Sequence, residues 1–114
     1  MKIVVIEDEQ LIAEDLIDIL KIISPDCEIV AHLSSVREGN DFFSGNYQVD
    51  LIFSDIQLGD GLSFELFKNF QPNIPVIFCT AYDEYAIEAF KANGIDYILK
   101  PYSAKNIKEA LEHY

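Results

Sequence analysis

Residues 50–61 read DLIFSDIQLGDG, and the rest of the chain is best interpreted from this stretch. Its apolar run at 51–53 is too short for a helix and is typical of a buried strand in a parallel sheet. The run ends at Asp55, and a turn with two glycines follows at 59–61. We therefore expect Asp55 at the carboxyl edge of the sheet, where open α/β sheets hold ligands. An Asp here also commonly caps the next helix, so the stretch alone leaves both interpretations open.

The chain has 114 residues, half of them hydrophobic, which predicts one domain with a real core over residues 1–114. Its formal net charge of −12 makes direct contact with nucleic acid or an anionic membrane a poor prospect, and should attract cations and basic partners. The apolar N-terminal run is interrupted by acids almost at once, unlike a signal peptide, and no run is long enough to span a membrane. A cytoplasmic protein is expected, with Cys27 and Cys79 as free thiols.

Hydrophobic periodicity predicts five strands that alternate with five helices. The strands are expected at 2–6, 27–33, 51–54, 75–79 and 96–99, and the helices at 12–23, 35–45, 62–70, 83–94 and 103–114. We expect a capping box of Ser35 and Glu38, helix caps at Asp83 and Ser103, and a left-handed helix end at Gly94. The last helix should bury one face that carries Ile107, Ala110, Leu111 and Tyr114.

Short connections between alternating strands and helices predict right-handed crossovers and a doubly wound parallel sheet. The first, third and fourth strands are the most apolar, so they should be central. The expected fold is therefore a single α/β domain of flavodoxin-like (βα)5 type, with strand order 2-1-3-4-5.

In this topology four strands end at one edge of the sheet, and each is followed by a polar side chain. Those side chains are Glu7 and Asp8, Asp55, Thr80 and Lys100. Taken singly, the acids could be helix-dipole residues, Thr80 a cap and Lys100 a surface lysine. Four strands that all end in such groups are hard to explain as caps.

Electrostatics favours a divalent cation among these residues. Two carboxylates ~4 Å apart repel by about 4 kcal/mol at an effective dielectric constant near 20, so an acid pair beside Asp55 is costly without a cation. Oxygen ligands on a shallow edge suit Mg²⁺. Zinc is not expected, because no His or Cys follows these strands; His32 and His113 are interpreted as surface or packing residues.

The same residues exclude other ligands of this fold. The acids at 7–9 would repel the phosphate of FMN, and neither a dinucleotide fingerprint nor a P-loop is present. A phosphatase of the haloacid dehalogenase type needs a second acid two residues after its Asp nucleophile, and that position holds Gln57. What remains is an Asp that accepts a phosphoryl group and keeps it for a while.

The expected chemistry follows from these roles. Asp55 attacks phosphorus in line. Mg²⁺ would be held by Glu7 and/or Asp8 and by Asp55, with the backbone carbonyl of Gln57 as a further candidate ligand. Lys100 and Thr80 would each contact a phosphoryl oxygen, so the protein mainly positions groups and compensates charge.

The chain resembles, over essentially its whole length, the receiver domain of bacterial two-component response regulators. Glu7-Asp8 match the acidic pair of that family, Asp55 its phosphoacceptor, Thr80 its hydroxyl residue and Lys100-Pro101 its Lys-Pro pair, whose peptide bond is cis in the family. The resemblance implies a sensor histidine kinase as partner, Mg²⁺ as cofactor and no enzymatic activity beyond the domain's own phosphotransfer and dephosphorylation.

Within the family, residues 55–67 and 78–103 resemble regulators with a LytTR (LytR/AlgR) DNA-binding output, which implies transcription regulation through a domain not in this chain. The resemblance also implies a switch in which Thr80 moves toward the phosphoryl group and Tyr97 follows. The face of the fourth helix, fifth strand and fifth helix would then change and could form a homodimer. Without the resemblance, Tyr97 is simply an edge-strand aromatic residue and that charged face is solvated.

Some positions depart from the family or leave its behaviour open. Gly59 stands where many receivers have Pro, so a more mobile loop is expected there. The Glu-Asp pair leaves open which acid touches the metal, and Gln57 and Tyr82 occupy positions that tune the acylphosphate lifetime. The alternative function is a pseudo-receiver, an interaction module without phosphotransfer, which Mg²⁺ binding and acylphosphate formation would distinguish.

Overall fold

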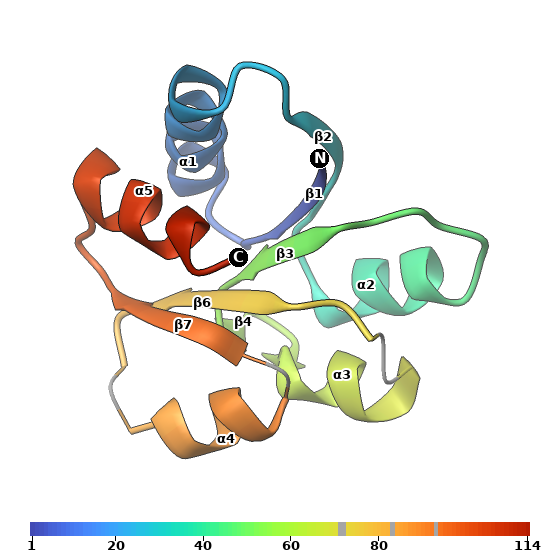
Figure 1. The fold of residues 1–114 in the computed structure, drawn as a ribbon. Coiled ribbons are helices and arrows are strands. Elements are labelled where there is room, and N and C mark those ends of the chain that lie inside the picture. The colour runs from blue at the N-terminus through green and yellow to red at the C-terminus, as the bar shows by residue number, and fades with distance from the viewer. Residues whose placement is uncertain (71–72, 83, 93) are drawn as a thin grey trace.

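The computed structural model describes residues 1–70, 73–82, 84–92 and 94–114, and Figure 1 shows their arrangement. The elements in chain order are β1 (Lys2–Ile6), α1 (Gln10–Ile23), β2 (Glu28–Leu33), α2 (Val36–Phe43), β3 (Leu51–Ser54), β4 (Gln57–Leu58), β5 (Gly61–Leu62), α3 (Phe64–Phe70), β6 (Val76–Thr80), α4 (Ala86–Lys91), β7 (Gly94–Leu99) and α5 (Ala104–Glu112).

Five of the strands form one parallel sheet in the order β2-β1-β3-β6-β7. This is the predicted order 2-1-3-4-5, because the short strands β4 and β5 stand outside the sheet. The three central strands are buried along almost their whole length. Continuous apolar runs produce such strands since both faces of the sheet are covered by helices.

Two apolar layers sandwich the sheet. One face packs Ile3, Val5 and Phe53 against α1 and α5, and the other packs Val4, Ile52 and Phe78 against α2, α3 and α4. Figure 1 shows α1 and α5 on one side of the sheet and the other three helices on the opposite side. Successive side chains of a strand point to opposite faces, so alternate residues stabilise opposite layers. Burial of each large apolar side chain contributes about 1.5–3 kcal/mol before entropy is counted.

A short hairpin follows β3, and the sequence did not predict it. Strands β4 and β5 pair antiparallel, and the Ser63 amide donates to the Ile56 carbonyl at 2.8 Å. Gly61 has φ 147°, a conformation that L side chains rarely adopt. The prediction that the next helix begins at residue 62 was therefore wrong: Leu62 belongs to the hairpin, and α3 begins at Phe64.

The N-terminus of α2 is capped partly from this hairpin. The Val36 and Arg37 amides donate to the Asp60 carboxylate at 2.8 and 3.0 Å, and the Ser35 hydroxyl accepts from the Glu38 amide at 3.0 Å. The Glu38 carboxylate, however, bonds to Ser34 rather than to the Ser35 amide. The predicted capping box is thus half formed, and Asp60 supplies acceptors that the sequence did not reveal.

Both ends of α4 differ from the prediction. The expected cap at Asp83 lies outside the described residues; Tyr85 precedes α4 and gives no side-chain cap. Gly94 does not end the helix in a left-handed conformation, because it opens β7 with no positive φ. A Cβ on Gly94 would lie 2.5 Å from the Ala89 carbonyl oxygen, so close packing, and not backbone freedom, explains the glycine.

The last helix follows the prediction at its start and departs from it at its end. Ser103 and Asn106 form a reciprocal capping box, and Ile107 and Ala110 are buried. Tyr114 was wrongly assigned to the buried face: it lies beyond α5 and is 53% exposed. His113 instead contacts the Asp96 carboxylate on β7, at 2.7 Å.

Both cysteines are free thiols, as predicted, with Cys79 buried and Cys27 half-buried. Within the described ranges, none of the helices has the length and apolar character needed to cross a bilayer.

Candidate functional site

The parallel register brings four strand ends together at the carboxyl edge of the sheet. The Asp55 amide, just after β3, donates to the Ile6 carbonyl at the end of β1, at 2.8 Å. The Lys100 amide, just after β7, donates to the Thr80 carbonyl at the end of β6, at 2.7 Å. The residues that follow these strands are therefore neighbours although they come from distant parts of the chain.

Lys100 ties the site together through two short ion pairs. Its Nζ lies 2.5 Å from Glu7 Oε1 and 2.9 Å from Asp55 Oδ2. The three side chains are only 15%, 5% and 10% exposed, respectively. Water therefore screens these charges much less than it screens a surface ion pair.

Backbone amides hold the remaining carboxylate oxygens. The Glu9 amide donates to Glu7 Oε2 at 3.2 Å, and the Ile56 amide donates to Asp55 Oδ1 at 2.7 Å. Each buried carboxylate thus has one oxygen on Lys100 and the other on the backbone, which fixes its orientation. The Asp8 carboxylate is exposed and completes a group in which one oxygen each of Glu7, Asp8 and Asp55 lies within 4.8 Å of the others.

Burial and charge act against each other in this cluster. Burial raises the pKa of Glu7 above its ordinary value, and the negative charge of Asp55 adds to that, while the hydrogen bond from Lys100 opposes it. For Lys100, burial alone would lower the pKa, but the hydrogen bonds to Glu7 and Asp55 outweigh it and raise the pKa. Lys100 therefore stays protonated. Its single positive charge does not neutralise the carboxylates around it.

The donor set fits a hard divalent cation. Three carboxylates and one ammonium leave two uncompensated negative charges, which one dication balances. All the donors are oxygens, the type that Mg²⁺ prefers, and exposed Asp8 keeps one side of the group open to water ligands. The residues predicted to bind a metal are thus brought together, apart from the Gln57 carbonyl, which stays a prediction.

Thr80 and Tyr97 lie on neighbouring strands beside this cluster. Thr80 is fully buried, and its hydroxyl accepts from the Tyr82 amide at 3.3 Å. Tyr97 is half-buried on the edge strand β7, and its hydroxyl donates to the Tyr82 carbonyl. Both side chains therefore contact the segment between β6 and α4. The Lys100-Pro101 peptide bond is cis, as the family resemblance implies.

The side chain of Gln57 makes a contact that the sequence did not predict. Its side-chain amide donates to the hydroxyl of Tyr85, which precedes α4, at 3.0 Å. The two residues are 28 positions apart, and no spacing pattern in the sequence predicts that their side chains meet. Only the folded chain brings this contact into view.

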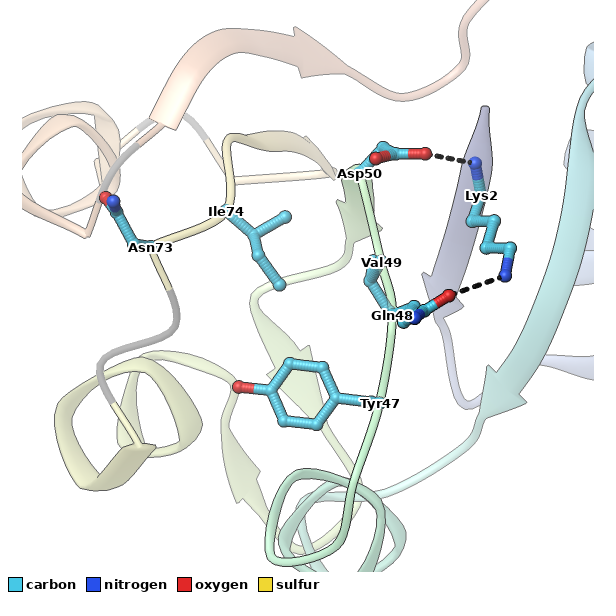
Figure 2. A pocket seen from close by; sticks show the side chains of 7 residues that line it. All are labelled: Lys2, Tyr47, Gln48, Val49, Asp50, Asn73 and Ile74. Carbon is cyan, nitrogen blue, oxygen red and sulfur yellow. Dashed lines mark hydrogen bonds between the residues drawn. The ribbon is translucent and has the colours of Figure 1, made fainter.

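A hollow of about 540 Å³ lies at the opposite, amino edge of the sheet (Figure 2). There the backbone amide of Lys2 donates to Asp50 Oδ2 at 2.7 Å and its Nζ donates to Gln48 Oε1 at 3.0 Å. These groups satisfy one another, so this hollow offers weaker support for chemistry than the acid cluster. It is lined by Lys2, Tyr47, Gln48, Val49, Asp50, Asn73 and Ile74.

The response regulator receiver domain family matches residues 3–112 of this chain. The chain belongs to that family. The matched range includes the acid cluster, Thr80 and Lys100 of this receiver domain, whose individual roles stay predictions.

Curated relatives support the more specific part of the resemblance. The receiver domain is 33% identical to the sensory transduction protein LytT of Bacillus anthracis over 100% of this chain and 47% of that protein. It is 36% identical to the transcriptional regulatory protein LytR of Staphylococcus aureus strain N315 over 97% of this chain and 46% of that protein. The chain spans about half the length of these curated relatives, and the prediction of a LytR-type relationship is confirmed.

A solved structure confirms the fold. The response regulatory domain of mrkE from Klebsiella pneumoniae superposes with a TM-score of 0.87 at 33% identity, covering 98% of this chain and 93% of that one. The receiver domain is therefore a doubly wound parallel sheet of the predicted type.

Proposed function

We propose that this receiver domain accepts a phosphoryl group on Asp55 from the phosphohistidine of a sensor histidine kinase. The observation that carries the proposal is the environment of Asp55: a nearly buried carboxylate, 2.9 Å from Lys100 and grouped with Glu7 and Asp8. One ion pair would satisfy a structural Asp, whereas Asp55 shares its lysine with Glu7 and lies in a group of three carboxylates. Such an arrangement suits a group that gains further negative charge.

In the transfer, a carboxylate oxygen of Asp55 forms a bond to phosphorus while the bond between phosphorus and the histidine nitrogen breaks. The electron pair of that bond returns to the imidazole, which can take up a proton. Lys100 compensates charge on the phosphoryl group, and the Thr80 hydroxyl is available to donate to it. The domain thus positions groups for its own phosphotransfer and later dephosphorylation, and we expect no other enzymatic turnover.

Glu7 and/or Asp8, Asp55 and the Gln57 carbonyl would hold Mg²⁺, which supplies positive charge against the phosphoryl oxygens. The charge count of the cluster supports this assignment, because two negative charges remain after Lys100 is included. Glu7 is already fixed by Lys100 and the Glu9 amide, so exposed Asp8 is the acid freer to turn toward a cation.

The output is proposed to be transcription regulation through a DNA-binding domain of LytTR type beyond this chain, as the names of the relatives suggest.

Phosphorylation would draw the Thr80 hydroxyl toward Asp55 and alter the Tyr97 contact with the segment before α4. The α4–β7–α5 face would then change and support a homodimer. With a net charge of −12 the receiver itself is unsuited to bind DNA, and we propose that it works in the cytoplasm.

Asp55→Asn tests the assignment. With Mg²⁺ and radiolabelled acetyl phosphate, the natural chain should take up label that hydroxylamine releases, and Asp55→Asn should take up none, because a carboxamide is a poor nucleophile. Asp50→Asn is the matched control: Asp50 precedes the same strand, and its substitution should leave labelling unchanged. Undiminished labelling of Asp55→Asn would refute the phosphoacceptor.

The alternative function, a pseudo-receiver that only binds partners, gives a different result. The natural chain would then take up no label and would bind no Mg²⁺ at the acid cluster. The buried Lys100–Asp55 pair disfavours this alternative, because a binding module gains little from uncompensated charge in its interior.

A further inference from the structure

The hydrogen bond between Gln57 and Tyr85 lies close to the proposed phosphorylation site. Gln57 follows Asp55 by two residues, so their Cα atoms are at most about 7 Å apart. Its half-buried side-chain amide donates to the Tyr85 hydroxyl at 3.0 Å. The polar side chain next along the loop from Asp55 is therefore held by a residue at the start of α4.

Aromatic contacts fix the Tyr85 ring. Its centroid lies 6.0 Å from that of Phe64 at an interplanar angle of 62°, and 6.3 Å from that of Tyr82 at 78°. Its backbone carbonyl accepts from the Ala89 amide at 2.9 Å, inside α4. Because the ring has little freedom, its hydroxyl is a well-placed anchor rather than a mobile surface group.

A carboxamide near an acylphosphate can affect its hydrolysis by orienting the attacking water, as a glutamine does in some nucleotide hydrolases. Gln57 can orient such a water only when its amide is free to turn toward Asp55. The bond to Tyr85 uses one of the two N–H donors of this amide and holds the carboxamide toward α4, which limits how its other N–H and its oxygen can turn toward Asp55.

We infer that Tyr85 is a positioning residue that anchors the Gln57 amide on α4 and thereby prolongs the lifetime of the acylphosphate. This inference rests on the proposed phosphorylation of Asp55. It links α4 to the phosphoryl group, because a movement at the start of α4 that displaces Tyr85 would free the Gln57 amide. The dephosphorylation step itself is attack of water on phosphorus, which restores the Asp55 carboxylate and releases inorganic phosphate.

The test compares acylphosphate decay in Tyr85→Phe, Gln57→Met and the double variant, after labelling with acetyl phosphate and Mg²⁺ and removal of the donor. Tyr85→Phe keeps the ring and removes only the hydroxyl. A neutral hydrogen bond shifts an equilibrium by about two- to tenfold, so decay should accelerate by about that factor. In the Gln57→Met background the Tyr85→Phe change should have no further effect, because there is no amide to free.

Controls separate this role from a structural one. Tyr47→Phe removes a hydroxyl at the opposite edge of the sheet and should leave decay unchanged. The Gln57 side-chain amide resonances in an NMR spectrum should shift in Tyr85→Phe and not in Tyr47→Phe. Slower or unchanged decay in Tyr85→Phe, or an acceleration that persists in Gln57→Met, would overturn the inference. A natural chain that takes up no label would instead overturn the proposed function, and this inference with it.

Discussion

The two edges of the central sheet each hold a lysine beside an aspartate, but they differ in almost every physical respect. At the carboxyl edge, Lys100 pairs with Asp55 and Glu7 through side chains that are at most 15% exposed. At the amino edge, Asp50 is exposed and bonds the backbone amide of Lys2, whose ammonium bonds an amide oxygen of Gln48. Both edges have a lysine and an aspartate. The charges interact more strongly at the carboxyl edge, because they are buried there and water screens them less.

The difference in burial is the reason that we propose the function at the carboxyl edge. Burial at the carboxyl edge raises the pKa of Glu7, and the three carboxylates there leave negative charge for a cation to balance. At the amino edge solvent and neutral partners satisfy each group, so little free energy is stored there. Substitutions at the two edges should therefore have very different effects.

The largest difference is expected between Lys100→Met and Lys2→Met. Lys100→Met leaves the Glu7 and Asp55 carboxylates without their cation and should lower the free energy of unfolding by about 3 kcal/mol in the absence of metal. Lys2→Met should change it by less than about 0.5 kcal/mol, because its exposed contacts are weak. Urea unfolding with and without Mg²⁺ measures both, and Mg²⁺ should restore part of the loss in Lys100→Met. Equal stability of the two variants would contradict the comparison.

Packing, rather than charge, should dominate at the amino edge. Gly94 begins β7, and a Cβ there would lie 2.5 Å from the Ala89 carbonyl oxygen and 2.9 Å from its carbonyl carbon. Gly94→Ala should therefore cost about 2 kcal/mol in the free energy of unfolding, since backbone must move to admit the methyl group. Gly45→Ala is a suitable control, because its Cβ would meet a backbone oxygen only at 3.8 Å. A Gly94→Ala chain as stable as the control would show that α4 and β7 can separate freely.

Metal binding should distinguish the two edges next. Glu7→Gln combined with Asp8→Asn removes two carboxylates from the cluster and should weaken Mg²⁺ binding by at least about tenfold, as measured by calorimetry. Asp50→Asn removes an acid of the same strand pair and should leave Mg²⁺ affinity unchanged. Comparable losses in both variants would mean that overall charge, and not this cluster, attracts the ion.

The smallest effect is expected at an exposed acid near the carboxyl edge. The pKa of Asp60 is lowered from its ordinary 3.8, chiefly by the hydrogen bond from the Val36 amide. Because the folded value is the lower one, its stabilising effect is complete above pH 3.8 and is lost as pH falls through the folded value. Asp60→Ala should lower the free energy of unfolding by about 1 kcal/mol at pH 7, and the difference should shrink in acid. A difference that is independent of pH would remove Asp60 as a charged cap.

The sheet could be predicted from the sequence because its signal is local. Runs such as 51–53 are apolar at every position, and an isolated run of that kind has few alternatives to a buried strand. The carboxyl-edge residues follow directly, since each stands one or two positions after such a run. The structure accordingly has Asp55, Thr80 and Lys100 at the ends of neighbouring strands, as the sequence predicts.

The features that escaped prediction depend on contacts between distant residues. Two-residue strands carry no periodic signal, so the β4–β5 hairpin was hidden inside a predicted turn and helix. The role of Gly94 depends on the closeness of Ala89, and that of Tyr85 on Gln57, 28 residues earlier. Tyr114 fitted the helical spacing but lies past the end of α5, where spacing no longer applies.

The hairpin after Asp55 also joins two helices that do not adjoin it in the sequence. Asp60 bonds the Val36 and Arg37 amides of α2, and Gln57 bonds Tyr85 before α4. Opening of the hairpin therefore exposes amides that belong to a different element. Hydrogen exchange at Val36 and Arg37 should accordingly follow the motion of the loop beside Asp55 more closely than the fraying of α2 itself.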